Sequence, residues 1–150
     1  MTGLSLCAIA LNEEQFLDGM LASVHGVVDE VVLGIDSRTT DATETIARAH
    51  GARTFRFDWH DSFAEACNLA IERARCEWIL RLDADERLLP EGRVRISELL
   101  ALGVPLDVDG FLMLLLETDL DGRALGPPQR SAARLFRNVP DLRYMGRIHE

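Results

Sequence analysis

The most informative stretch of the chain is Trp78-Ile79-Leu80-Arg81-Leu82-Asp83-Ala84-Asp85-Glu86. A short apolar run ends there in three carboxylates within four residues. The apolar run predicts a buried strand. Because strand interiors exclude acids whose charge is not compensated, the acids are expected at the end of this strand. In open α/β sheets, ligands bind at the carboxyl ends of the strands. These acids are therefore expected at a ligand-binding edge.

Two of the acids, Asp83 and Asp85, are spaced so that an extended or tightly turned backbone could direct both at one point. Hard oxygen ligands of this kind suit Mg²⁺ or Mn²⁺, which commonly bind through one or two carboxylates plus substrate phosphates. On these residues alone, a solvated acidic loop after the strand is an equally good interpretation. The remaining sequence has to decide between the two.

Length and composition indicate an ordinary globular chain. Its 150 residues fit one domain, and it contains 47% apolar and 27% charged residues. No apolar run is longer than that from Phe111 to Leu116, which is far shorter than the roughly 20 residues that a membrane span needs. The amino terminus lacks the basic region and cleavage site of a signal peptide. We therefore expect a cytoplasmic protein, with attachment to the inner membrane face left open.

The three cysteines, Cys7, Cys67 and Cys76, are odd in number and match no metal-binding spacing. They are expected to be buried, reduced thiols.

Charge is distributed unevenly along the chain. The net charge of −9 argues against binding to a nucleic-acid backbone. Residues 122–150 contain six arginines and two acids, a net of +4, which leaves −13 for the rest. There is no lysine, and arginine binds phosphate through a planar, bidentate fork. An acidic site facing this basic tail would suit a metal-bound diphosphate, although a merely solvated tail is the alternative.

Strand and helix patterns alternate at a spacing of about 25 residues, which predicts an α/β fold with a mostly parallel sheet flanked by helices. The expected strands are residues 4–11, 30–35, 52–57, 77–82, 111–116 and 133–136. Helices are expected after the capping residues Asn12, Asp41 and Ser62, and from Pro90 to about Leu102.

Polar residues follow three of the expected strands, and parallel strands would bring them to one edge. They are Asn12 and Glu13, the turn that begins at Asp36, and the Asp83 to Glu86 cluster. Asn12 alone is best explained as a helix cap, and Asp36 either as part of a polar turn or as an acceptor for a nucleobase or ribose. Neither of the two common glycine-rich phosphate loops is present. Phosphate binding would therefore depend on a metal and on arginine.

The ordered motifs resemble family 2 glycosyltransferases with a GT-A fold. The resemblance is carried by LCAIALNEE at 6–14, VDEVVLGIDSRTTDAT at 28–43, WHDSFAEACNL at 59–69 and WILRLDADE at 78–86. RLFRN at 134–138 and GRIHE at 146–150 resemble the later blocks of one bacterial subgroup. The match runs in order over nearly the whole chain. It implies a single Rossmann-like GT-A domain, shortened at its carboxyl end if the protein continues as family members usually do.

The resemblance also implies a reaction, the inverting transfer of a sugar from a UDP- or GDP-linked donor to a carbohydrate, lipid or protein acceptor. Asp83-Ala84-Asp85 would be the DxD motif, with Asp85 as the direct Mn²⁺ or Mg²⁺ ligand and Asp83 shared between metal and ribose. His149 would be a third metal ligand. The base that takes the acceptor's proton would be Glu150, with Glu86 as the second candidate.

The donor site implied by the resemblance is larger than the metal site. Asp36 would contact the nucleobase, and Arg134 or Arg137 would stabilise the leaving diphosphate. The full set of donor-binding candidates is Ala10, Asn12, Glu13, Asp36, Arg38, Asn68, Asp83, Ala84, Arg134 and Arg137.

Two departures from the family pattern bear on donor binding. Ser37-Arg38-Thr39-Thr40-Asp41-Ala42-Thr43 replaces the usual Gly-Ser-Thr-Asp-Gly-Thr, so the turn could differ and Arg38 could project into the donor pocket. Cys67 stands where the family often has an arginine that approaches the nucleotide.

Other functions are compatible with parts of this pattern. A GT-A module that binds a nucleotide or a partner without turnover is the main alternative. A haloacid dehalogenase-type phosphatase also carries a DxD after a strand, but early in the chain and followed by Thr or Val, unlike Glu86-Arg87 here. An oligomer is also compatible with the sequence, because residues 111–116 could form an interface strand.

Overall fold

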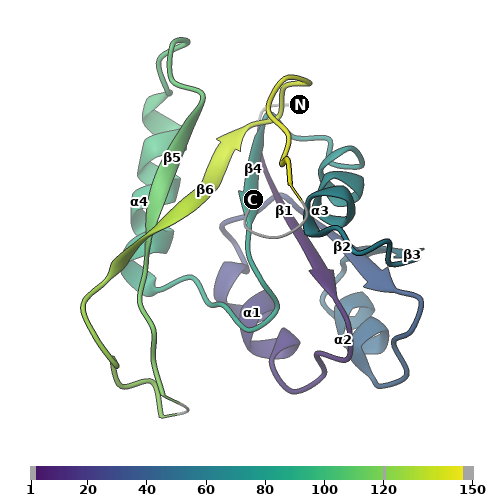
Figure 1. Cartoon of the computed structure of the whole chain (residues 1–150). Coiled ribbons are helices and arrows are strands. Elements are labelled where there is room, and N and C mark those ends of the chain that lie inside the picture. The colour runs from purple at the N-terminus through teal and green to yellow at the C-terminus, as the bar shows by residue number, and fades with distance from the viewer. Residues whose placement is uncertain (1–2, 120, 147–150) are drawn as a thin grey trace.

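The computed structural model describes residues 3–119 and 121–146 (Figure 1). Strands and helices alternate through the first two thirds of the chain, and two strands follow. In chain order they are β1 (Leu4–Ala10), α1 (Leu17–Val24), β2 (Glu30–Asp36), α2 (Thr43–Ala49), β3 (Arg53–Phe57), α3 (Phe63–Ile71), β4 (Trp78–Arg81), α4 (Pro90–Leu102), β5 (Gly110–Leu115) and β6 (Gln129–Arg137).

All six strands of the described residues join one sheet, in the order β3-β2-β1-β4-β6-β5. The first four strands are parallel, and β6 runs antiparallel to both β4 and β5. The prediction of an α/β fold with a mostly parallel sheet flanked by helices is confirmed. The strand order reverses between β1 and β4, which is the kind of switch point where open α/β sheets bind ligands.

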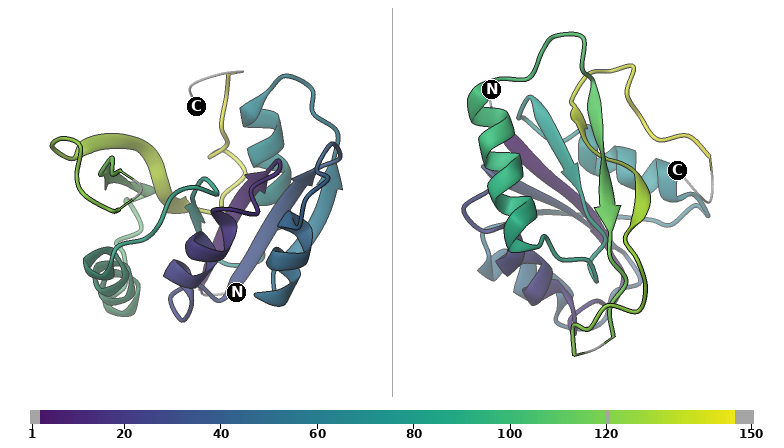
Figure 2. Two further views of the ribbon diagram at one scale, coloured as in Figure 1. Left: turned by 90° about the horizontal axis from the view of Figure 1, so that it is seen from below. Right: turned by 90° about the vertical axis from the view of Figure 1, so that its left-hand side faces the viewer.

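Helices cover both faces of the sheet (Figure 2). On one face α1, α2 and α4 pack against residues such as Leu6, Leu33 and Leu80. On the other face, α3 packs against Cys7 and Ile79 together with the segment that follows β6. Because successive side chains of a strand point to opposite faces, each central strand contributes to both cores and is apolar along its length.

Local signals set several element ends as expected. Pro90 begins α4, where its missing N–H would have no helical partner. Gly51, with φ of +77°, ends α2 in the left-handed region that glycine adopts readily. Ser62 caps α3 by accepting a hydrogen bond from the backbone N–H of Glu65. The Glu65 carboxylate pairs with His60.

The prediction that Asn12 caps a helix is wrong. Asn12 has a φ of +54°, and α1 begins only at Leu17 after an intervening turn. The Asn12 side-chain oxygen accepts a hydrogen bond of 2.9 Å from the Thr40 backbone N–H. Beside it, the Glu13 N–H donates to Oγ1 of Thr43. Asn12 therefore ties the loop after β1 to the loop after β2, at the carboxyl edge of the sheet.

The edge strand β5 serves both the core and the surface. Phe111 and Met113 pack against the core, whereas Leu112 and Leu114 are exposed. All three cysteines are buried thiols, as expected. Among the described helices, none combines the length and apolarity needed to cross a bilayer.

Candidate functional site

A cleft of about 610 Å³ lies at the carboxyl ends of the parallel strands. It spans the switch point between β1 and β4 and extends to the residues that follow β3. At the β1 and β4 side it is lined by Glu13, Asp83 and Asp85, and we call these residues the carboxylate end. At the β2 and β3 side it is lined by Asp36, Arg38, Phe57, Trp59 and Phe63, which we call the planar end. Ala10 and Ala84 line it with small side chains.

Two arginines compensate Asp83. Nη1 of Arg81 lies 2.7 Å from Oδ1 of Asp83, and Nη2 of Arg134 lies 3.2 Å from Oδ2. Arg134 also pairs with Oε1 of Glu86 at 2.9 Å. Arg81 is buried and is the last residue of β4, and Arg134 belongs to the antiparallel neighbour β6. This network explains how a buried strand can end in a cluster of acids.

Asp85 and Glu13 have no such compensation. Asp85 is exposed, and no hydrogen bond or ion pair to its carboxylate is present among the residues that the structure describes. The pKa of Glu13 is raised, first by partial burial and then by the negative charges of Asp85, Asp41 and Asp83. Repulsion between uncompensated carboxylates would be relieved by a bound cation.

The carboxylate end fits Mg²⁺ or Mn²⁺ as a partial site. Its donors are hard oxygens, as these ions prefer. Within residues 3–119 and 121–146, no group of three His, Cys, Asp or Glu side chains is arranged to hold a metal alone. Substrate phosphates would have to complete the coordination, which is usual for Mg²⁺. The predicted ligand His149 and the predicted base Glu150 lie outside the described residues.

Glu86 is held beside the cleft rather than lining it. Its Oε2 accepts a hydrogen bond of 2.8 Å from the Asp83 backbone N–H, and its Oε1 accepts from Arg134. Burial is the main cause that raises the pKa of Glu86. Glu86 therefore supports the turn that presents Asp83 and Asp85.

Asp36 and Arg38 form a closed pair at the planar end. Asp36 is 2% exposed, and Arg38 donates to it from its backbone N–H, from Nε and from Nη2. These hydrogen bonds hold the pKa of Asp36 below its usual value. The Arg38 guanidinium lies 6.0 Å from the centre of the Trp59 ring, and Trp59 packs edge-on against Phe63.

Four predicted donor-binding residues do not line the cleft, and one of them, Arg134, pairs with Asp83 and Glu86 as described above. Arg137 stacks over Trp78 at 4.6 Å and donates to backbone carbonyls ahead of β5. The side-chain amide of Asn68 donates to and accepts from the backbone of Tyr144. Asn12 ties two loops together, as described above. Their proposed contacts with a donor remain predictions.

Six cleft residues were not among the predicted site residues: Ile9, Leu11, Phe57, Trp59, Phe63 and Arg81. Arg81 carried a usable signal, because an arginine inside an apolar strand next to three acids needs a nearby counter-charge. Trp59 had no such signal, since nothing local predicts that the turn after β3 faces the loop after β2.

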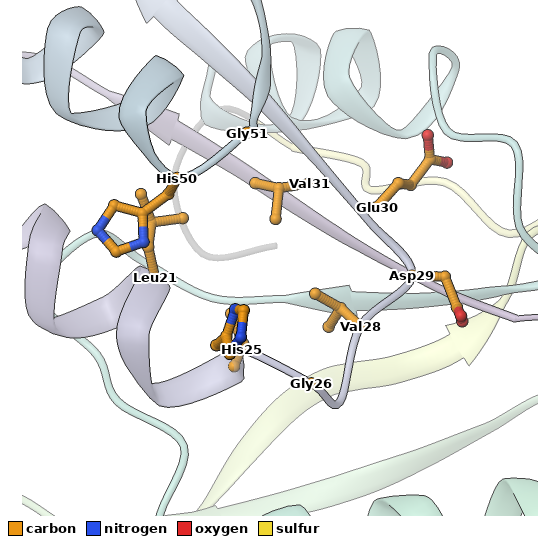
Figure 3. A pocket seen from close by; sticks show the side chains of 10 residues that line it. Leu21, His25, Gly26, Val28, Asp29, Glu30, Val31, His50 and Gly51 are labelled. Carbon is orange, nitrogen blue, oxygen red and sulfur yellow. The ribbon is translucent and has the colours of Figure 1, made fainter.

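A second, smaller cavity of about 140 Å³ opens near the amino end of β2 (Figure 3). It is lined by His25 and His50, with Asp29 and Glu30 on its other side. Both acids are already used: Asp29 accepts from the Leu4 backbone N–H, and Glu30 accepts from Ser5 and Arg53. These contacts hold the strand starts together.

The family described as "Glycosyl transferase family 2" matches residues 5–101. A TPR repeat-containing protein of Synechococcus elongatus is 39% identical over 150 residues, which is all of this chain and 35% of that protein. An uncharacterized glycosyltransferase of Rickettsia felis is 35% identical over 106 residues, covering 67% of this chain and 35% of the relative. The chain spans about a third of the length of these curated relatives.

Solved structures share the fold. Residues 1–349 of S. aureus TarS, in complex with UDP-GlcNAc, superpose with a TM-score of 0.57 at 19% identity, over 92% of this chain and 46% of that one. The mannosyltransferase PcManGT from Pyrobaculum calidifontis, in complex with GDP-Man and Mn²⁺, gives 0.56 at 20% identity, over 70% of this chain and 34% of that one. At these identities the likeness concerns the fold alone.

Proposed function

The chain belongs to glycosyl transferase family 2, and we propose that it binds a nucleotide-diphosphate sugar in the cleft and transfers the sugar, with inversion, to an acceptor hydroxyl. The observation that supports this most is the division of the cleft: uncompensated carboxylates at the switch point and planar side chains further along the same edge. A diphosphate with its cation would suit the first, and a nucleobase the second.

The carboxylate end is proposed to hold the cation. Asp85 would be the direct ligand, with Glu13 and Asp83 beside it. When bound, Mn²⁺ or Mg²⁺ would neutralise the charge that develops on the leaving diphosphate. Arg134 already pairs with Asp83 and Glu86, and it would add a fixed positive charge near the phosphates.

Inversion by direct displacement requires a carboxylate that accepts the proton of the acceptor hydroxyl. Glu150 is the proposed base, and Glu86 is the second candidate. The hydrogen bonds of Glu86 favour a supporting role, because both of its oxygens already accept. If Glu150 is the base, Glu150→Gln abolishes sugar transfer by the longest form of the protein and leaves donor affinity unchanged. Equal loss of transfer and of donor binding would contradict that role.

The metal assignment is tested by titration calorimetry with UDP-GlcNAc and with GDP-Man, each with and without Mn²⁺. We expect Mn²⁺ to strengthen binding of at least one donor, and Asp85→Asn to remove that gain. Asp107→Asn is the matched control, because Asp107 is exposed and lies outside the cleft. Retention of the full Mn²⁺ effect by Asp85→Asn would exclude Asp85 as a ligand.

A binding module without turnover is the second candidate. It is favoured by Cys67, which stands at the family's arginine position and instead accepts a hydrogen bond of 3.3 Å from the buried Arg81. Donor binding without hydrolysis or transfer, both by this chain and by a longer form, would support the module over the enzyme.

A further inference from the structure

We propose that Arg38 selects the nucleobase of the donor and that it favours guanine over uracil. The inference rests on the proposed function, since it assumes that a nucleotide occupies the cleft. It concerns the planar end and adds a specificity-determining residue to the donor site.

Asp36 is closed to a ligand by its own neighbour. Its Oδ1 accepts from the Arg38 backbone N–H and from Nε, both at 2.9 Å, and its Oδ2 accepts from Nη2 at 2.6 Å. Only 2% of Asp36 is exposed. A base N–H that approached Asp36 would have to displace a bidentate, charge-assisted pair, which is among the stronger hydrogen-bonding arrangements in proteins. A nucleobase that enters the cleft would therefore contact Arg38 and not Asp36.

Arg38 presents a donor pair to the cleft. Its guanidinium has five N–H groups, of which Nε–H and one Nη2–H face Asp36. The Nη1 group and the second Nη2–H have no hydrogen-bond partner within residues 3–119 and 121–146, and the Arg38 side chain is 58% exposed. Because Asp36 fixes the other edge of the guanidinium, this pair of donors is held in place before any ligand arrives.

Two parallel donors match a base edge with two adjacent acceptors. Guanine offers O6 and N7, the commonest bidentate partner of arginine. On uracil each carbonyl oxygen is flanked by the N3–H donor, and on adenine N7 is flanked by the N6 amino group, so one donor would face another. Cytosine offers N3 and O2, but its ring is smaller and stacks over less area.

Aromatic side chains next to Arg38 favour the larger ring. Trp59 lies beside the guanidinium, and its indole N–H donates to Asp61 at 3.0 Å, which fixes the plane of the ring. Phe63 packs against the edge of Trp59 with 4.9 Å between ring centres. Aromatic faces in such a cleft stabilise a stacked base without hydrogen-bonding specificity, so the arginine is left to discriminate.

The test is a set of calorimetric titrations of this chain with GDP, UDP, CDP and ADP, each with the same excess of Mn²⁺. We expect GDP to bind at least about tenfold more tightly than UDP, which corresponds to the low end of the discrimination by one bidentate contact. UDP binding that is as tight as GDP binding, or tighter, overturns the inference and leaves the proposed function standing. CDP or ADP binding that is tighter than GDP binding has the same consequence. Failure of all four nucleotides to bind overturns the proposed function itself.

Two variants distinguish the effect of the planar donor pair of Arg38 from that of its positive charge. Arg38→Lys keeps the positive charge but loses the planar pair of donors, so the ratio of GDP to UDP affinity is expected to fall below about threefold. Arg56→Lys is the matched control, because Arg56 on β3 makes a comparable pair with Glu44 of α2 outside the cleft. An unchanged ratio in Arg38→Lys contradicts the proposal. The wild-type ranking decides the question if that variant does not fold.

Discussion

The acids of the cleft differ in how their charge is compensated, and this difference assigns their roles. Asp36 and Asp83 accept from arginine guanidiniums. Asp85 and Glu13 have no such partner among the described residues, and the pKa of Glu13 is raised by burial and by its acidic neighbours. The compensated acids are suited to holding the site's shape, and the uncompensated pair is suited to a cation.

Glu13→Gln should stabilise the chain at pH 7 when no metal is present. The folded pKa of Glu13 is raised, so ionised Glu13 opposes folding above that pKa. The gain should vanish as the pH falls below about 4.3, the usual pKa of glutamate in an unfolded chain. Urea unfolding measures it, with exposed Glu98→Gln as control. Mn²⁺ affinity should fall in the same variant; a variant that is destabilised at pH 7 would contradict the assignment.

The Asp36 pair should give the opposite pH dependence. Arg38 lowers the folded pKa of Asp36, so the pair stabilises the chain above about pH 4 and loses this effect as the pH falls through the folded pKa. Arg38→Gln should therefore be less stable than wild type at pH 7, with a difference that shrinks towards pH 3. A difference independent of pH would show that Asp36 is not the partner that matters.

At the scale of secondary structure, local signals predicted elements better than they predicted side-chain partners. The helix from Pro90 to Leu102 has the expected bounds, because a proline at its start acts locally. Asn12 was wrongly predicted as a cap because its actual partner, Thr40, is 28 residues away. Asn68 likewise bonds to Tyr144, 76 residues later. Contacts of this kind depend on the tertiary arrangement and leave no pattern in the sequence.

Asn68 offers a direct test of the difference between a structural and a donor-binding role. Asn68→Ala removes two hydrogen bonds to the Tyr144 backbone and should lower stability by about 1–3 kcal/mol. Nucleotide affinity should stay within about twofold of wild type, since Asn68 does not line the cleft. Exposed Glu72→Ala at the end of α3 is the control. A large loss of affinity without loss of stability would restore the predicted donor contact.

Over the whole molecule, the topology explains why acids from separate strands converge. The four parallel strands place the ends of β1, β2 and β4 on one edge, and the order reverses between β1 and β4. This much follows from alternating βα patterns in the sequence. The pairing of Arg134 with Asp83, across 51 residues, depends on the antiparallel return of β6 beside β4 and could not be predicted from spacing.

A crystal structure of this chain with GDP and Mn²⁺ would test the location of the donor most directly. We expect the base against Arg38 and Trp59, and the diphosphate and Mn²⁺ at Asp85 beside Glu13. A nucleotide bound anywhere outside the cleft at the β1–β4 switch point, or one whose phosphates lie away from Asp85, would contradict the proposed donor site.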